Sequence, residues 1–112
     1  MHDVQQGEVF IKFYAGARNG LMAHLGADLW HLYCALATYM DRDGSCYPTQ
    51  KKLARDLGIR RETVNKRLKR LLEIEYNGEK IVTAEKRRDP KTQVYVNTVY
   101  KLNTNLAFRI FV

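Results

Sequence analysis

The chain has 112 residues, enough for one domain and short for two. Apolar residues make up 46% and charged residues 28%, which fits a soluble globular protein and excludes a disordered or collagen-like chain. Nineteen lysines and arginines against twelve acidic residues leave a net charge of +7, which indicates a polyanionic partner: nucleic acid or an anionic membrane surface.

The first elements expected along the chain are a strand and two helices. Residues 9–14 are rich in β-branched and aromatic side chains, which predicts a strand. Residues 17–25 predict a short helix that Gly26 closes with a left-handed cap. Asp28 is then expected to cap a helix that runs to about Met40, because apolar residues recur there at i, i+3 and i+4 spacing. The apolar stripe of this helix is Leu29, Leu32, Tyr33, Leu36, Ala37 and Met40.

Residues 19–41 contain few charges, yet they do not predict a membrane span. A span needs about 20 continuous apolar residues, and Asp28 at mid-span would cost roughly 2.5–3.5 kcal/mol. A buried helix is therefore expected. Trp30 and His31 lie beside the centre of the apolar stripe and are candidates for contact with a second chain.

Two further helices are expected on either side of Gly58. Thr49 can cap the first, since its hydroxyl accepts a hydrogen bond from first-turn amides, and Pro48 discourages an earlier start. Gly58 ends this helix, and Arg60 or Arg61 opens the next. The inward-facing residues of that next helix are Val64, Leu68, Leu71 and Leu72.

The C-terminal part of the chain predicts a β-hairpin. Residues 81–84 and 94–100 have strand composition, and the loop at 87–91 contains the turn-forming pair Asp89-Pro90. Asn77-Gly78 is an earlier turn signal. The apolar tail at residues 106–112 receives no assignment.

All of the excess positive charge lies in residues 51–70, called the basic window below. It contains nine basic and two acidic residues, whereas the other 92 residues contain ten of each. Solvated helical faces usually mix both signs, and neighbouring like charges mildly destabilise a helix. The basic window therefore indicates a surface that binds an anion.

The residues around Gly58 indicate a helix-turn-helix. A close crossing of two helices needs a small residue, which Ala54 provides, and the sharp turn needs a residue that tolerates positive φ, which Gly58 provides. In this motif the second helix enters the major groove of DNA. The polar side of that helix, opposite Val64, carries Lys66, Arg70, Thr63, Glu62 and Lys69, with Asn65 and Arg67 on its flanks.

These side chains suit the chemistry of DNA. Arginine and lysine neutralise phosphates or bind guanine, asparagine suits adenine, and threonine can contact the thymine methyl group. Arg60 and Arg61 lie at the helix start, where groove-entering helices make their first contacts. Glu62 either accepts a hydrogen bond from cytosine or stabilises the positive end of the helix dipole, and the second role is favoured.

Residues 47–71, YPTQKKLARDLGIRRETVNKRLKRL, resemble the bacterial winged helix-turn-helix pattern. The pattern occurs in GntR-like regulators and in amino-terminal domains of plasmid and phage replication initiators and DnaD-type primosomal proteins. The resemblance covers about residues 8–102, with its specific part at 47–72. It implies an α+β fold, in which a three-helix core has an N-terminal strand and a C-terminal β-hairpin wing. That family usually has Ser or Thr where Arg60 stands, so the helix cap is expected to be weaker by about 1 kcal/mol.

The resemblance also implies which residues contact DNA. Residues at the positions of Arg61, Thr63 and Asn65 face DNA in that family, and the wing follows the backbone or the minor groove. The alternative for the hairpin is a solvated surface. The full set expected to contact double-stranded DNA is Thr49, Lys51, Arg60, Arg61, Thr63, Asn65, Lys66, Arg67, Lys69, Arg70, Arg87, Arg88 and Lys91.

The expected function is sequence-specific binding of double-stranded DNA through a recognition helix at about 61–74 and the wing. The protein is then a small transcriptional regulator or a replication-initiator module, and homodimers would match two-fold DNA sites. The alternative is a self-assembling protein–protein scaffold of a replication or primosome complex, which Trp30 and the apolar tail leave open. RNA binding is a weaker option, because the strands show no pattern of stacked aromatic residues.

Catalysis, metals, cofactors, small-molecule ligands and membranes are not expected. His24, His31, Cys34 and Cys46 lack finger-like spacing, and no Ser-His-Asp set or glycine-rich phosphate loop stands out. Two cysteines and a start without signal-peptide regions fit a reduced, cytoplasmic protein. The expected organisation is a flexible segment at 1–7, a winged-helix domain at 8–102 and a C-terminal tail at 103–112 of unknown role.

Overall fold

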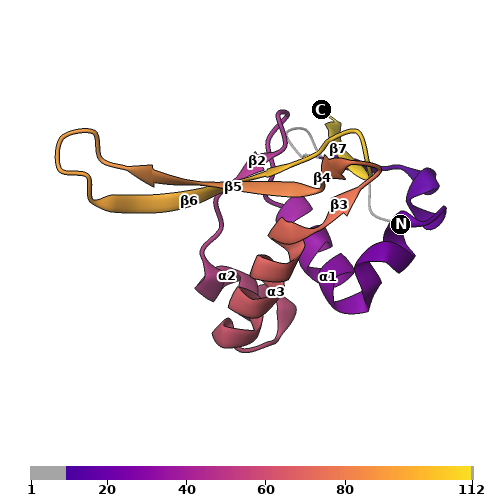
Figure 1. The fold of residues 1–112 in the computed structure, drawn as a ribbon, viewed down its shortest axis with the longest axis horizontal. Helices are drawn as coiled ribbons and strands as arrows, with labels where there is room; N and C mark the ends of the chain where they lie inside the picture. The colour runs from indigo at the N-terminus through magenta and orange to yellow at the C-terminus, as the bar shows by residue number, and fades with distance from the viewer. Residues whose placement is uncertain (1–9, 112) are drawn as a thin grey trace.

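The computed structural model describes residues 10–111, which form an α+β domain with three α-helices (Figure 1). The expected segment at residues 1–7 and the start of the first expected strand lie outside the described residues. The elements in chain order are β1 (Phe10–Phe13), the 3₁₀ helix η1 (Ala15–Arg18), α1 (Leu21–Ala37), β2 (Ser45–Cys46), α2 (Gln50–Leu57), α3 (Arg61–Glu73), β3 (Glu75–Tyr76), β4 (Glu79–Lys80), β5 (Val82–Arg88), β6 (Tyr95–Leu102) and β7 (Phe108–Phe111).

The core lies where α1, α2 and α3 pack together under the sheet. The apolar stripe predicted for residues 28–40 is confirmed, since all six of its members are buried. Leu53 of α2 and Val64 and Leu71 of α3 are fully buried against it. Each helix therefore turns one apolar side inward, which leaves its polar side available at the surface.

The predicted division into two helical segments at Gly26 is confirmed, but the outer boundaries of both segments differ from the prediction. Residues 15–18 form a 3₁₀ helix, and α1 runs from Leu21 through Gly26 to Ala37. Gly26 has φ 76° and ψ 168°, so it bends α1 sharply and is not a left-handed cap. Asp28 lies inside α1, and Met40 lies beyond its end although it is buried. Gly26 therefore ends the first helical segment, as predicted, although its ψ is not that of a left-handed cap.

The main sheet has the strand order β2-β6-β5, and both strand pairs are antiparallel. β5 and β6 form the predicted hairpin, which extends well beyond the helices (Figure 1). The strands are longer than predicted, so Arg87 and Arg88 belong to β5 and not to the loop. Val82 and Leu102 anchor the base of the hairpin in the core, where both are buried.

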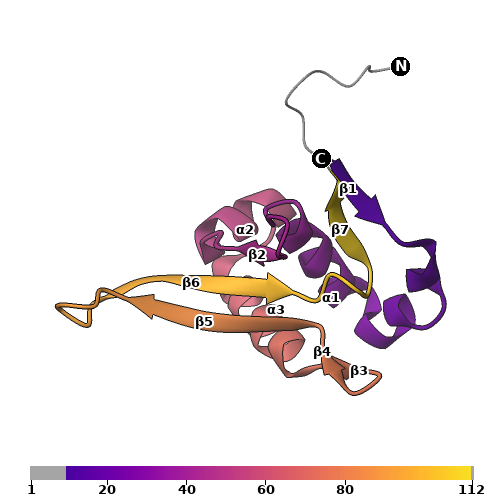
Figure 2. The same ribbon diagram turned by 90° about the horizontal axis from the view of Figure 1, so that it is seen from above.

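The C-terminal tail, left unassigned by the sequence, supplies β7, which pairs antiparallel with β1. This two-stranded ribbon lies away from the hairpin tip (Figure 2). Trp30 packs there within its own chain, with its ring centroid 5.7 Å from that of Phe13 and 5.6 Å from that of Phe108. The Trp30 ring, a predicted candidate for contact with a second chain, therefore helps to attach the ribbon to α1.

Candidate nucleic-acid interface

The sharp turn after α2 sets the direction of α3. Gly58 has φ 68° and ψ 33°, the left-handed conformation that glycine adopts without strain. The Gly58 N–H donates to the Arg55 carbonyl at 3.3 Å, and the Ile59 N–H donates to the Ala54 carbonyl at 3.1 Å. These bonds close the end of α2, and α3 begins three residues after Gly58. The bend predicted at Gly58 is confirmed.

The start of α3 has the weak cap expected from Arg60. Arg60 occupies the N-cap position with extended backbone, and its side chain makes no capping hydrogen bond. Glu62 lies in the first turn, where a carboxylate favours the positive end of the helix dipole. At the start of α2, by contrast, the Thr49 hydroxyl accepts a hydrogen bond from the Lys52 N–H at 3.1 Å, as predicted.

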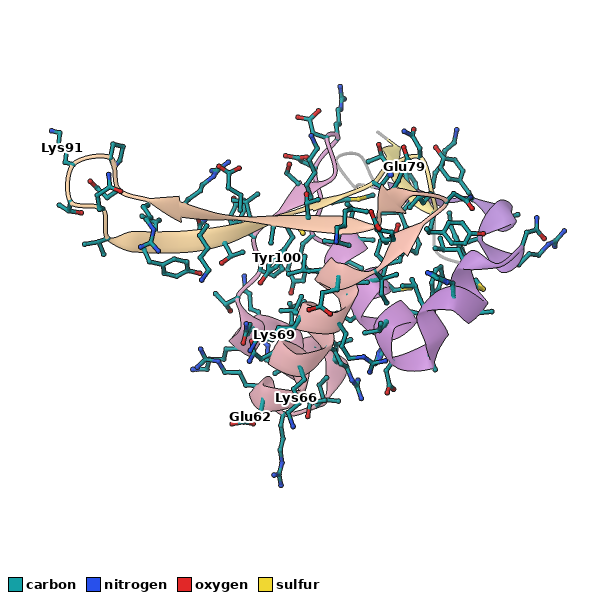
Figure 3. The ribbon with its side chains drawn as sticks, in the orientation of Figure 1. Glu62, Lys66, Lys69, Glu79, Lys91 and Tyr100 are labelled. Carbon is teal, nitrogen blue, oxygen red and sulfur yellow. The ribbon has the colours of Figure 1, made fainter. Side chains whose placement is uncertain are left out.

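The two sides of α3 differ sharply in exposure. Val64, Leu68 and Leu71 are buried on the inner side. The opposite side is exposed, and Figure 3 shows Glu62 and Lys66 pointing away from the core while Lys69 lies below the hairpin. The exposed side chains of α3 are Arg61, Glu62, Lys66, Lys69, Arg70 and Glu73, and Thr63 is half-buried.

One flank of α3 faces α1 and is closed by an ion pair. The guanidinium of Arg67 lies 3.4 Å from the carboxylate of Asp28, and only 19% of the Arg67 side chain is exposed. The Asp28 side chain is 65% exposed, so the pair lies at the surface and offsets the charge of Arg67 only in part. Asp28, which was predicted to cap a helix, forms an ion pair with a residue of α3.

The other flank of α3 faces the start of α2 and the hairpin, which we call the wing (residues 82–102). Three shallow hollows, of about 450, 280 and 240 Å³, adjoin Gln50, and the second and third also include residues of the wing; they are called the wing-side hollows. Gln50 of α2 lines all three, and its Nε2 donates to Oδ1 of Asn65 at 3.2 Å. Arg61 lines the first and third, next to Glu62 in one and Tyr95 in the other.

The hollow of about 280 Å³ joins α3 to the wing. Its walls carry Lys69 from α3 and Lys86 from β5, with Asn65 and Thr98 between them. Lys86 was missed by the sequence analysis, which placed the cations of the hairpin in its loop. Once the strand is known to include Ala84, which faces the helices, the period-two alternation of a strand puts Lys86 on the same face.

The wing cations differ in the face that they occupy. The register is irregular between Arg87 and Arg88, but Arg88 pairs with Tyr95, which lines a wing-side hollow, so Arg88 shares the face of Lys86. Arg87 follows Lys86 directly and lies on the outer face. The Arg88 Nη1 also donates to the Gln93 carbonyl at 3.4 Å. Lys91 lies at the tip (Figure 3).

The tip itself is held by Asp89. Its carboxylate accepts hydrogen bonds from the N–H groups of Lys91 at 2.8 Å and Thr92 at 3.1 Å. These bonds favour the ionised form and lower the pKa of Asp89 below its usual value. The predicted Asp-Pro turn therefore acts through the aspartate side chain.

Histidines and cysteines do not gather in the described part of the chain. Residues 10–111 contain no group of three or more His, Cys, Asp or Glu side chains that could hold a metal ion. His24 Nε2 instead hydrogen-bonds the Glu75 carbonyl at 2.7 Å. Burial raises the pKa of the Cys46 thiol to about 12 and also raises that of Cys34. No helix within these residues has the length and apolar character to cross a bilayer.

Two helices joined by a tight glycine turn, preceded by a third and followed by a β-hairpin, define a winged helix-turn-helix domain. The predicted fold class is thereby confirmed. Residues 24–76 are similar to the family model described as a helix-turn-helix domain, and this similarity points to DNA binding. No curated protein and no solved structure matches the chain.

Proposed function

We propose that the protein binds double-stranded DNA sequence-specifically, with α3 in the major groove and the wing on the adjacent backbone. The observation that carries the proposal is the shared surface of α3 and the wing, where Lys69 and Lys86 line one hollow from opposite sides. A helix of 13 residues is about 20 Å long, and the major groove, about 12 Å wide, admits such a helix.

Charge supports the same surface. Exposed cations on it are Arg61, Lys66, Lys69, Arg70, Lys86 and Arg88, and Glu62 stands among those of α3. Such a surface attracts the phosphates of both strands and gains free energy by releasing their counterions. Arg67 is left out of the proposed contact set because it already forms an ion pair with Asp28. Thr49 and Lys51 at the start of α2, Arg60, Thr63, Arg87 and Lys91 remain proposed backbone contacts at its edges.

The proposed biological role is that of a small transcriptional regulator or of the DNA-binding module of a replication protein. Both roles use the same contact between a helix and the major groove, and both commonly use dimers on two-fold sites. No catalytic step belongs to this proposal.

Two lysines of the sheet provide a matched test. Lys86 shares the helix-facing side of the sheet, whereas Lys101 is an exposed lysine on its opposite side. Lys86→Met should weaken binding of a labelled duplex in fluorescence anisotropy at least threefold, and Lys101→Met should leave it unchanged. Equal effects of the two substitutions would show that the charge acts without a defined surface, and no binding by the unaltered protein would refute the proposal.

Self-association is a second candidate function, favoured by the aromatic ribbon at the other end of the molecule. Phe13 of β1 is 53% exposed, although its ring stacks on Phe108 at 5.2 Å. Exposed aromatic residues on an edge ribbon can pair with a second copy. Sedimentation velocity distinguishes the two: a monomer or dimer fits a DNA-binding regulator, and larger species that grow with concentration fit a scaffold.

A further inference from the structure

We infer that Gln50 determines base specificity by holding the amide of Asn65 in the orientation that binds one adenine. This inference deepens the proposed function and rests on it. Gln50 lies on α2, outside the recognition helix, and its residue type carries no charge that would mark it as a DNA contact.

Gln50 lines all three wing-side hollows, and Asn65 lines the first two. Gln50 is the first residue of α2 and Asn65 lies in the middle of α3, and both are half-buried. Nε2 of Gln50 donates to Oδ1 of Asn65 at 3.2 Å, which turns the amide oxygen of Asn65 toward α2. Arg61 and Lys69 lie one helical turn before and after Asn65, so cations flank the pair along α3.

The remaining hydrogen-bonding capacity of Asn65 matches adenine. An amide oxygen accepts two hydrogen bonds and the amide nitrogen donates two. Gln50 uses one acceptor position of Oδ1, which leaves a second acceptor position and both donors of Nδ2. In the major groove, adenine presents the N6 amino donor beside the N7 acceptor, and asparagine binds this pair with two hydrogen bonds. An amide that is already oriented loses less conformational entropy on binding.

The surroundings favour a base edge over a phosphate as the partner of this pair. Cations neutralise phosphates through charge, whereas the Gln50–Asn65 pair is uncharged and supplies only directional bonds. The cations Arg61 and Lys69 on either side can hold the backbone and bring the base edge to the amides. Gln50 is thus a positioning residue for Asn65 as the base-reading residue.

Selection from a pool of random duplexes, followed by sequencing, tests this assignment. The unaltered protein should select one position at which adenine is enriched. Asn65→Ala should reduce discrimination at that position about five- to 150-fold, the range expected when a two-bond contact is lost. Asn65→Asp should move the preference toward cytosine, whose amino group a carboxylate accepts. Gln50→Met, which keeps the side-chain length and removes the donor, should weaken the preference at the same position only.

Lys66→Met serves as the control, because it removes a charge from the same helix and should lower affinity for all sequences alike. The inference is overturned if the unaltered protein shows a base preference that Gln50→Met leaves unchanged, and equally if Asn65→Asp leaves it unchanged. It is also overturned if binding occurs with no base preference at all. If the unaltered protein binds no duplex, the proposed function itself fails, so the two failures are distinguishable.

Discussion

The two flanks of α3 carry the same kind of charge in different surroundings. On the α1 side, Arg67 lies 3.4 Å from Asp28 and is 19% exposed. On the wing side, Lys69 shares an open hollow with Lys86, and residues 10–111 show no carboxylate within ion-pair distance of either lysine. Both flanks come from one stretch of sequence, the basic window.

The surroundings of a cation, and not its presence in a basic run of sequence, therefore determine whether it stabilises the fold or binds an anion. A cation in a surface ion pair contributes modestly to stability, whereas a cation without an acidic partner on a concave surface contributes to anion binding. Substitutions on the two flanks should therefore change different measured quantities.

The largest effect is expected on the inner side of α3, which separates the two flanks. Leu71 is fully buried, so Leu71→Ala removes apolar contacts and leaves a cavity. We expect the free energy of unfolding to fall by about 2–5 kcal/mol, measured by urea denaturation. A loss below about 0.5 kcal/mol, the size typical of surface positions, would mean that α3 is not anchored on this side.

The next effect concerns the exposed cation Lys66. Lys66→Met should lower duplex affinity about eightfold at 0.1 M salt, because one phosphate contact releases about 0.9 counterion. The melting temperature should stay within a degree or two of that of the unaltered protein. Unfolding of the variant, or an unchanged duplex affinity, would contradict the assignment of Lys66 to the DNA-binding surface.

Arg67→Met tests the flank of α3 that faces α1. The substitution removes the ion pair with Asp28 and leaves the stem packed, so we expect the free energy of unfolding to fall by about 1 kcal/mol. The salt dependence of DNA binding should remain that of the unaltered protein. A shallower salt dependence would instead assign Arg67 to the phosphate contacts.

The smallest effect is expected at the wing tip. Hydrogen bonds from the Lys91 and Thr92 N–H groups lower the pKa of Asp89 in the folded protein. The turn is therefore stabilised above the unfolded pKa of about 3.9, and this contribution is lost as pH falls through the lower folded value. Amide exchange of Thr92 should accelerate with acid beyond the intrinsic pH dependence in the unaltered protein, and Asp89→Asn should remove that excess.

Much of this fold follows from local signals in the sequence. Thr49, Gly58 and the leucines of α3 predict the helix-turn-helix, because a cap, a left-handed turn and a helical period each act within a few residues. The pairing of β7 with β1 did not follow, because it joins segments almost a whole chain apart. Gly26 marks the break between two helical segments as its sequence signal predicted, whereas the 3₁₀ helix at residues 15–18 was not distinguished from the first segment.

The candidate interface was predicted less completely than the fold. The outward side of α3 follows from the helical period, so the exposure of Lys66 and Arg70 was predictable. The roles of Arg67 and Gln50 depend on contacts with α1 and α3, which no local pattern reports. The sequence did not predict the position of Lys86, because β5 extends beyond the apolar residues that indicated a strand.

The dependence of duplex affinity on salt concentration is the direct test of whether α3 and the wing bind the DNA backbone. If the surface formed by α3 and the wing binds the DNA backbone, the logarithm of the association constant should fall linearly with the logarithm of salt concentration, with a slope of about −4 to −6 for roughly five to seven phosphate contacts. A slope near zero between about 50 and 200 mM salt would contradict the account, because a cationic surface that neutralises phosphates must release counterions.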